Sequence, residues 1–200
     1  VNAGTTDMVV AAKTGSKIRL IPNGSTANEV QITTGGNIVM KNGTGIDFGA
    51  SSGSNSTSTT LDDYEEGNFT PTVLVADSAT GVTVSHSAGT YTKVGRVVSV
   101  SLRWRITSKG SNSGNVEIGG LPFTVANQLG TTSIECSGSV AYVGGISGTW
   151  YDLTCFAAES TTKLGFYIRT STSGVPGGLI NSHIANIFDG RLSIVYYTTA

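Results

Sequence analysis

The sequence predicts an all-β chain in which short, repetitive N-terminal strands precede a β-sandwich or jelly-roll-like head. Gly, Ser, Thr and Asn make up 91 of the 200 residues, well above ordinary globular usage, and these residues favour turns between strands. Long segments also alternate apolar and polar residues, which is typical of half-buried strands. No segment has a helical period of convincing length, although 179–188 fits either one short helix or a strand.

Residues 1–49 contain a repeat of apolar pairs, each pair separated by one polar residue. The pairs recur every eight residues, with four extra residues after the second pair: Val10/Ala12, Ile18/Leu20, Val30/Ile32, Ile38/Met40 and Ile46/Phe48. Each pair contributes only two side chains of modest size, which cannot form a core that excludes water within one chain. Several copies of the chain therefore have to share one core. Three copies form the smallest ring that encloses an axis, which predicts a trimeric β shaft with an eight-residue repeat. The alternative is a β-meander, or a stretch packed on the second domain.

Residues 50–72 are predicted to be a linker and an acidic junction. The stretch 50–60 has no apolar anchor, which is typical of a flexible or hydrated linker. The run 61–67 then places four of the thirteen acidic residues within five positions. Adjacent carboxylates favour water or a cation, but the run lacks the spacing and the glycine of a calcium loop. A solvated turn is therefore the preferred interpretation, and no metal site is predicted.

Residues 73–200 are predicted to form the head, because they contain strand-like runs separated by Gly, Ser and Asn turns. The clearest strand is expected over 96–106. Its buried face is predicted to hold five residues: Val98, Val100, Leu102, Trp104 and Ile106. Two further runs repeat the pattern, with Leu164, Phe166 and Ile168 in one and Leu192, Ile194 and Tyr196 in the other. Further strands are expected near 82–86, 90–94, 132–143 and 150–157.

The charge balance argues against nucleic acid and membranes as partners. The chain has 12 Lys and Arg against 13 Asp and Glu, which gives a formal net charge of -1. It therefore lacks the excess of positive charge that attracts nucleic acid phosphates or an anionic membrane surface. No run of about 18 apolar residues appears, and the first residues lack a signal-peptide pattern, so no membrane insertion is expected. The first residue is Val1 rather than Met, and we expect a missing N-terminal segment that attaches the chain to a larger assembly.

The two cysteines, Cys136 and Cys155, lie in strand-like runs on either side of the turn 144–149. The midpoint of the pair falls inside that turn, so we expect the two residues to be near neighbours across a hairpin. One pair is weak support for an oxidising compartment in a chain of this size. Reduced, packed thiols are therefore preferred over a disulfide.

The sequence predicts no catalytic residues and no cofactor, and the chain is interpreted as a non-enzyme. The histidines His86 and His183 have no metal ligand at the right spacing, and no serine lies in a nucleophile-elbow pattern. A glycosidase needs two carboxylates across a cleft. The acids of the head are scattered singly along the sequence: Asp77, Glu117, Glu135, Asp152, Glu159 and Asp189. A pair could still meet in space, so a polysaccharide depolymerase stays as an alternative.

Sugar binding needs exposed aromatic faces beside hydroxyl and amide groups, and the stretch 146–151 has this composition. Trp150 and Tyr151 are adjacent, so in an extended strand one ring faces outward. The outward ring either contacts a ligand or covers a neighbouring subunit, and the two interpretations are equally favoured. Lys109, Asn112 and Asn115, in the stretch 108–115, are further candidates for receptor binding, as is the loop 173–178.

Three stretches carry a family resemblance. Residues 61–72 read LDDYEEGNFTPT, which resembles a junction common in tail fibre proteins of tailed bacteriophages. Residues 89–98, GTYTKVGRVV, and 120–123, GLPF, are similar to stretches before and after a long strand in the same fibres. The resemblance covers 61 to about 125, and beyond that point no motif is assigned.

The resemblance implies a structural protein of the virion, located in the tail fibre. It implies a homotrimer with a slender shaft and a β-sandwich tip that binds a glycan or protein on the surface of a bacterial host, and an N-terminal segment that joins other tail proteins. It also implies assembly in the reducing bacterial cytoplasm, which agrees with unpaired thiols. It assigns no binding residue. The competing classes are a fibre-borne depolymerase and a non-viral secreted β-sandwich binding module.

Overall fold

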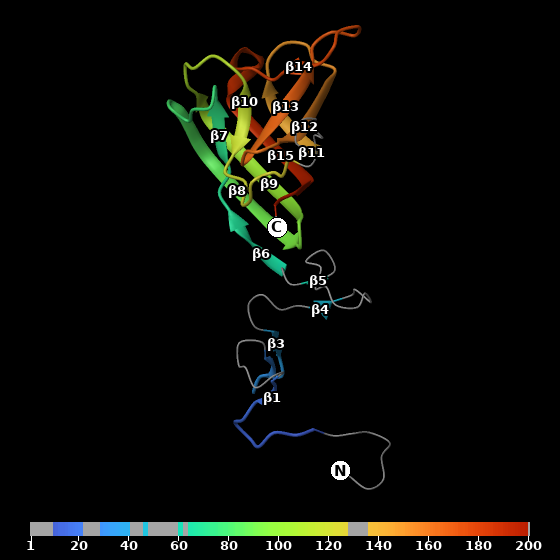
Figure 1. Ribbon diagram of the computed structural model, residues 1–200. Coiled ribbons are helices and arrows are strands. Elements are labelled where there is room, and N and C mark those ends of the chain that lie inside the picture. Colours follow the sequence, from blue (N-terminus) through green and yellow to red (C-terminus); the bar gives the residue numbers. More distant parts are fainter. Residues whose placement is uncertain are drawn as a thin grey trace. The chain divides into compact units, whose positions relative to one another are not determined.

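A computed structural model describes residues 10–21, 29–40, 46–47, 60–61, 64–127 and 136–199. The regular structure of these residues consists of strands and one short 3₁₀ turn, which confirms the all-β class (Figure 1). The chain divides into two compact units, Val1–Asp63 and Tyr64–Ala200. None of the described residues forms a helix with the length and hydropathy that a membrane span requires.

The first unit contains a small antiparallel sheet of β1 (Ile18–Leu20), β2 (Val30–Ile32) and β3 (Ile38–Met40). The apolar pairs at these positions are therefore strands, as predicted. They pair with one another in the order β1-β2-β3, which is a local β-meander within one chain, while the trimeric shaft stays a prediction. β4 (Ile46–Asp47) pairs with β5 (Thr60–Leu61), whereas the described residues around Val10 and Ala12 form no strand. Phe48 and most of the predicted linker lie outside the described residues.

The meander leaves its apolar face poorly covered. Cross-strand register places Ile18, Ile32 and Ile38 in one row, and Leu20, Val30 and Met40 in the next. Ile38 remains 69% exposed and Leu20 64% exposed, although both belong to a face made of aliphatic side chains. A face of this kind gains free energy if another surface covers it.

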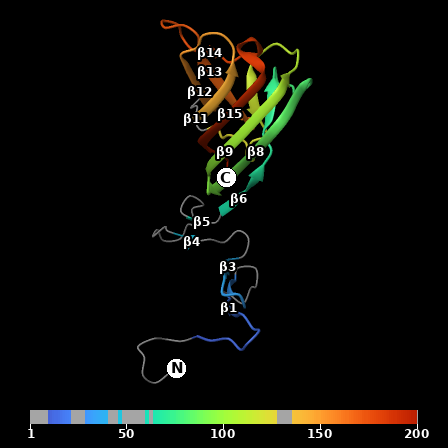
Figure 2. The same ribbon diagram turned by 180° about the vertical axis from the view of Figure 1, so that it is seen from behind.

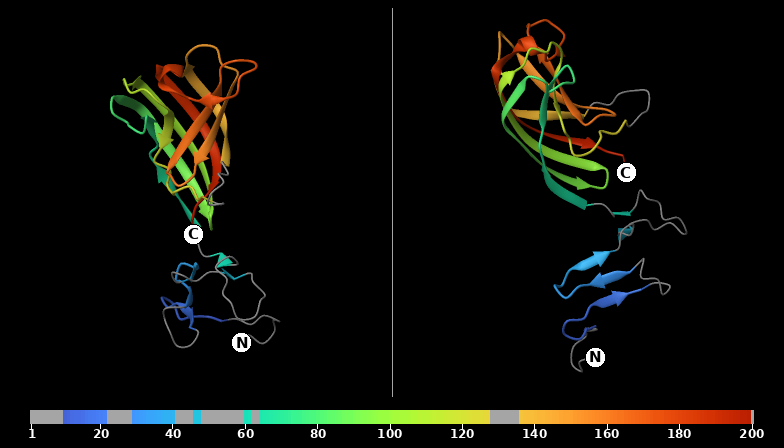
Figure 3. Two further views of the ribbon diagram at one scale, coloured as in Figure 1. Left: turned by 45° about the horizontal axis from the view of Figure 1, so that its top comes forward. Right: turned by 90° about the vertical axis from the view of Figure 1, so that its left-hand side faces the viewer.

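The second unit is built around one antiparallel sheet that curls around a core. Its strands are β6 (Tyr64–Phe69), β7 (Thr72–Val75), β8 (Val82–Val94), β9 (Val97–Lys109), β10 (Val116–Gly119), β11 (Cys136–Ile146), β12 (Asp152–Ala158), β13 (Lys163–Arg169), β14 (Gly177–Gly178) and β15 (Ile184–Tyr197). Their order is β6-β8-β9-β15-β11-β12-β13-β10-β7, with β14 paired to β13. β6 and β7 end this path on opposite sides, yet only Thr70 and Pro71 separate them in sequence. The sheet therefore folds back on itself, in agreement with the predicted β-sandwich or jelly-roll style (Figures 1, 2 and 3).

The strand β9 has the predicted alternation. All five of its predicted core residues are buried, and Trp104 and Ile106 are fully covered. The outward residues Ser99, Ser101 and Arg103 lie on the opposite face. The predicted core residues of β13 and β15 are also buried: Leu164, Phe166, Ile168, Leu192, Ile194 and Tyr196. Trp104 contacts Phe166 and Phe188, with ring centroids 5.8 and 5.6 Å away, so it joins the two sides of the curled sheet.

The second half of the acidic run forms a strand, and the prediction of a solvated turn was wrong for these residues. Tyr64–Phe69 pairs with β8 along the edge of the sheet. The carboxylates stay exposed to solvent and accept from tyrosine hydroxyls: Tyr64 Oη donates to Glu66 Oε2 at 2.8 Å, and Tyr91 Oη donates to Glu65 Oε1. Asp62 and Asp63 lie outside the described residues.

Two other predicted elements differ in extent. The strands expected at 82–86 and 90–94 are one strand, β8, whose pairing with β9 is irregular around Val84. The ambiguous segment 179–188 combines both alternatives, because a 3₁₀ turn at Asn181–His183 leads directly into β15. Leu179 and Ile180 precede the turn, and Ile184 and Ile187 lie in the strand.

Tyr196 is expected to make stability fall at alkaline pH. Burial raises the pKa of its phenol to about 12, and the hydroxyl donates to Phe123 O at 3.2 Å. The neutral form is favoured in the folded state, so its contribution is complete below the ordinary pKa of about 10 and is lost as the pH rises through 12. We expect a loss of about 2–3 kcal/mol, from two pKa units.

The measurement compares the unfolding free energy of the unchanged chain and of Tyr196→Phe at pH 8 and at pH 11.5. The other titrating groups are common to both chains, so the difference between them isolates Tyr196. The unchanged chain should lose more stability than the variant at the higher pH. An equal loss in both chains would contradict the buried, hydrogen-bonded placement of this phenol.

Candidate functional site

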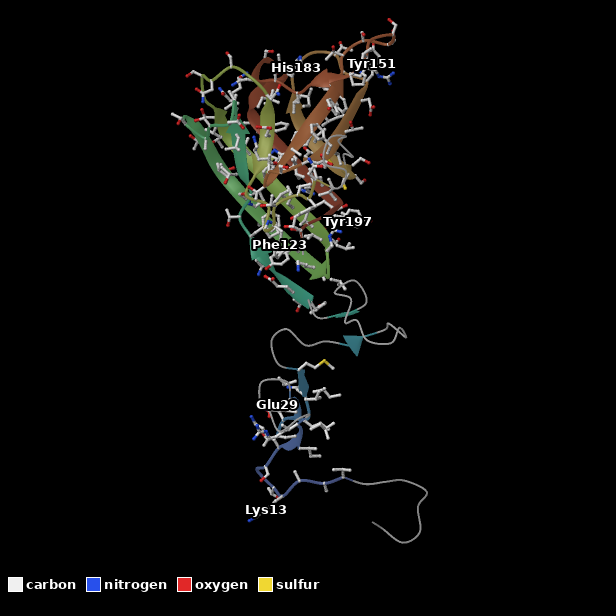
Figure 4. All side chains as sticks on the ribbon, in the orientation of Figure 1. Lys13, Glu29, Phe123, Tyr151, His183 and Tyr197 are labelled. Atoms are coloured by element: carbon white, nitrogen blue, oxygen red, sulfur yellow. The ribbon has the colours of Figure 1, made fainter. Side chains whose placement is uncertain are left out.

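Several loops of the second unit meet at one end of the sheet. Ser147 N donates to His183 O at 2.8 Å, which joins the loop after β11 to the 3₁₀ turn before β15. Lys109, at the end of β9, reaches the same turn. Figure 4 shows Tyr151 and His183 at this end, with Phe123 and Tyr197 toward the other end of the unit. We call this region the loop end and define it by residues 109–115, 146–151 and 180–183.

Trp150 and Tyr151 both present exposed side chains at the loop end. They lie in the bend between β11 and β12, outside any strand, with exposed fractions of 39% and 50%. Tyr151 N donates to Arg169 O at 2.8 Å, which fixes the main chain of the bend against β13. The strict alternation of a strand does not apply to a bend, so both rings are accessible. Val175, in the loop 173–178, is another exposed apolar residue.

Lys109 and Asn112 have supporting positions at the loop end. The Lys109 ammonium donates to Asn181 O at 2.9 Å and to Ile184 O at 2.6 Å, and Asn112 O accepts from Asn181 Nδ2 at 2.6 Å. Both residues are partly buried. The structure thus brings both residues, which hold the 3₁₀ turn, to the same end as the exposed rings of Trp150 and Tyr151.

Two of the scattered acids of the head meet in space. Lys163 Nζ forms ion pairs with Asp77 Oδ1 and with Glu117 Oε2, the latter at 3.3 Å. The hydrogen bond from Lys163 lowers the pKa of Asp77, whereas burial raises the pKa of Glu117. The hydrogen bond to Asp77 in turn raises the pKa of Lys163. The groove of about 510 Å³ beside Lys163 is lined by neither carboxylate, so this trio has the arrangement of a structural ion-pair network.

Asp189 forms ion pairs with Arg103 and Arg105, and Glu135 lies outside the described residues. Among the residues that the structure describes, no group of three or more His, Cys, Asp or Glu side chains gathers as metal ligands would. His183 Nδ1 accepts from Ile180 N at 3.3 Å, so this imidazole takes part in the 3₁₀ turn.

Cys136 and Cys155 lie on the adjacent strands β11 and β12, as the hairpin prediction required. Cys155 is opposite Gly138, two positions from Cys136, and both thiols are free. Burial raises the pKa of the Cys155 thiol, which keeps it protonated and unreactive at neutral pH.

Sequence reasoning did not find a groove on the outward face of β8, β9 and β15. The groove has a volume of about 650 Å³. The residues that matter for its chemistry are Thr90, Ser101, Arg103, Arg191 and Ser193. The outward position of Ser101 and Arg103 was visible in the alternation of β9, but their neighbours on other strands depend on the register of the sheet. We call this feature the outward groove.

A row of apolar side chains crosses the same sheet face at the other end of these strands. The register pairs Tyr64 with Val94, Val94 with Val97, and Val97 with Tyr197. Their exposed fractions lie between 41% and 64%. We call Tyr64, Val94, Val97 and Tyr197 the apolar row. Four neighbouring exposed apolar side chains form a surface that favours contact with another protein surface.

Comparisons with known proteins give a likeness in fold. No protein family matches the chain, and no curated protein matches its sequence. A crystal structure of the Dettilon tailspike protein is similar, with a TM-score of 0.52 and 20% sequence identity. The match covers 67% of this chain and 24% of the tailspike chain, so this chain spans about a quarter of the length of its structural neighbour.

Proposed function

We propose that this chain is a structural protein of a bacteriophage virion, located in the tail fibre, and that its head binds a glycan or protein on the surface of a host bacterium. The observation that carries the proposal is the fold likeness between 67% of this chain and the Dettilon tailspike protein. The stretch 61–72 and its resemblance to tail fibres support it from the sequence. The proposed organisation is a shaft over 1–49, a connection over 50–72 and a head over 73–200.

The three stretches that resemble tail fibres meet in the structure, which gives the resemblance a physical reason. Phe69 belongs to the first stretch, Tyr91 to the second and Phe123 to the third. The Tyr91 ring lies 6.5 Å from the Phe69 ring and 5.4 Å from the Phe123 ring, measured between centroids. Lys93 Nζ lies 5.4 Å from the centre of the Phe123 ring. These residues form one aromatic cluster, so their spacing in sequence serves a shared packing requirement.

A homotrimer is supported by two apolar surfaces that one chain leaves open. The apolar row lies on the sheet of the second unit, and the aliphatic face of the β1-β2-β3 meander lies in the first. Three identical chains arranged around an axis would cover both kinds of surface with copies of themselves. The free energy gained is that of removing apolar area from water, about 25 cal/mol per Å².

Receptor contact is proposed for Trp150 and Tyr151, with Lys109 and Asn112 holding the loop end that presents them. Aromatic rings on a short bend offer flat apolar faces to sugar rings or to a protein surface at little entropic cost. Three such sites on one trimer, and several fibres on one particle, would bind a cell tightly even if each contact is weak. The alternative function is that of an enzyme, a polysaccharide depolymerase. The experiment in the next paragraph distinguishes the two functions.

The test is binding of the fluorescently labelled chain to a panel of bacterial strains, measured by flow cytometry with unlabelled chain as competitor. The proposal predicts saturable, competed binding to a subset of strains. Polysaccharide purified from those strains should release no reducing ends on incubation with the chain. Absence of binding across a broad panel would contradict the proposal, and release of reducing ends would select the depolymerase.

A further inference from the structure

Two arginines lie side by side in the outward groove. The register of β8, β9 and β15 places Ala88, Arg103 and Arg191 next to one another across three strands. All three residues line the groove. Ala88 has a side chain of one carbon, so the β8 side of Arg103 is left open. Among the described residues that line the groove, Arg103 and Arg191 are the ones that carry a charge.

The positive charge around the groove is only partly balanced. Asp189 Oδ2 accepts from Arg103 Nη2 at 3.5 Å and from Arg105 Nη1 at 3.4 Å. Both contacts are longer than the distance of about 2.7–2.9 Å that is usual for a charge-assisted hydrogen bond. Arg191 instead stacks near Tyr142, with its Cζ 5.4 Å from the ring centroid. One carboxylate therefore pairs with two guanidinium groups while Arg191 adds a third positive charge nearby, so the local charge is positive although the whole chain is near neutral.

Arg103 also has an unused donor. Its Nε is buried and has no hydrogen-bond partner, and Asp189 Oδ1 is buried and without a partner as well. A buried donor without a partner costs free energy, so this part of the Arg103 side chain is not optimised for its contact with Asp189. A guanidinium presents its Nε and Nη donors in a planar fork that fits both oxygens of a carboxylate or phosphate. The Arg103 side chain is 37% exposed although its Nε is covered, so the accessible part of the guanidinium is what an anionic group in the groove would contact.

Beside apolar lining residues such as Phe69, Leu102 and Leu192, the groove also provides neutral polar groups. Thr90, Ser101 and Ser193 are paired in register one row away from the arginines, and their hydroxyls form a line across three strands. Asn68 on β6 is paired with Thr90 on β8 and adds a side-chain amide to this line. A second groove of about 440 Å³ shares Asn68, Thr90 and Ser101, so the polar surface continues along the sheet. Hydroxyl and amide groups of this kind suit the hydroxyls of sugars.

We propose that the outward groove binds an acidic sugar unit, with Arg103 and Arg191 binding its carboxylate or phosphate and the hydroxyl line binding the neighbouring sugar. This inference deepens the proposed function, on which it rests, by assigning an anionic glycan as a ligand class. It places a second glycan contact on the sheet face, distinct from the exposed rings of the loop end. Two arginines on a near-neutral chain can bind isolated anionic groups spaced along a polymer. They do not provide the extended positive surface that a nucleic acid backbone requires.

The test uses the full chain and saturation-transfer NMR with three probes. Tetragalacturonate carries carboxylates, its methyl ester has the same sugars without charge, and mannose 6-phosphate carries a phosphate. We expect binding of at least one anionic probe and at least tenfold weaker binding of the methyl ester. Preference between the two anionic probes identifies the anionic group. Equal binding of tetragalacturonate and its methyl ester, or no binding of either anionic probe, would overturn the proposal.

Variants connect the binding to the groove. Arg103→Gln and Arg191→Gln should each weaken binding of the anionic probe by about 10- to 100-fold, the usual effect of losing a hydrogen bond to a charged group. Lys13→Gln removes one positive charge from an exposed residue of the first unit and should leave binding unchanged. Ala88→Tyr keeps the charge, fills the groove and should abolish binding. Unchanged binding in both arginine variants would reject the site.

Two controls establish that the arginines act through ligand binding rather than through folding or assembly. The native mass and the circular dichroism spectrum of each variant should match those of the unchanged chain. A change in native mass in both arginine variants would assign the groove to a contact between copies and overturn the proposal. Cell binding by the labelled chain is measured in parallel. If the unchanged chain binds cells but the arginine variants bind the anionic probe as well as it does, the acidic-sugar site is rejected and the proposed function stands. If the arginines govern probe binding but no strain binds, the proposed function fails and the acidic-sugar site stands.

Discussion

Replacing Trp104 with alanine is expected to lower the free energy of unfolding by about 3–5 kcal/mol. Trp104 is fully buried on β9, between Phe166 and Phe188. Its removal leaves a cavity between the two sides of the curled sheet, and the surrounding strands are too constrained by their pairing to close it. Denaturant unfolding followed by circular dichroism, at one fixed protein concentration, should show a lower midpoint with an unchanged slope.

Two further substitutions make the expected loss specific. Gly190 lies opposite Trp104 on β15, where an added Cβ would come 2.1 Å from Trp104 Cζ2. Gly190→Ala should therefore destabilise the chain as well, because the indole has to move. Ser99→Ala, on the outward face of the same strand, should change stability by less than about 0.5 kcal/mol. If Trp104→Ala were as stable as Ser99→Ala, the packing described for the core would be wrong.

Replacing Trp150 and Tyr151 together with alanine is expected to reduce cell binding by about 30-fold or more. Aromatic residues dominate the binding energy of many interfaces, and losing a single central one costs about 2 kcal/mol or more, which is about 30-fold in affinity. Both rings lie exposed at the loop end and outside the core, so their loss should leave folding intact. The reduction is measured in the flow-cytometry assay, with strains that bind the unchanged chain.

The control for this prediction is the native mass, because a ring that covered a neighbouring subunit would change assembly instead. Trp150→Phe keeps an aromatic face and should retain more binding than Trp150→Ala. Unchanged cell binding in Trp150→Ala and in Tyr151→Ala would reject the assignment of the receptor contact. A loss of binding together with a smaller native mass would place the two rings at a subunit interface.

The parts of the fold that depend on local alternation could be predicted from the sequence. The buried residues of β9 were predictable because adjacent side chains of any strand point to opposite faces, whatever the strand pairs with. The strands at Ile18, Val30 and Ile38 were predictable for the same reason. Their pairing was not, because a meander within one chain and a core shared by three chains require the same spacing of apolar residues.

The features that depend on register could not be predicted in this way. Arg103 and Arg191 are neighbours across β9 and β15, and Asp77 meets Lys163, although each pair is far apart in sequence. The acidic residues Glu65 and Glu66 belong to a strand that pairs with β8, and their carboxylates accept from tyrosine hydroxyls on β6 and β8, contacts that composition does not reveal. Trp150 and Tyr151 were found from residue type, whereas the supporting position of Lys109 became evident only with the 3₁₀ turn in place.

The measurement that tests the central claim most directly is the native mass of the purified chain, determined by light scattering behind a sizing column. Three copies sharing the apolar row and the aliphatic face of the meander predict three times the chain mass of 20.5 kDa, over a wide range of protein concentration. A single species of 20.5 kDa at all concentrations would contradict the homotrimer and favour an isolated β-sandwich binding module.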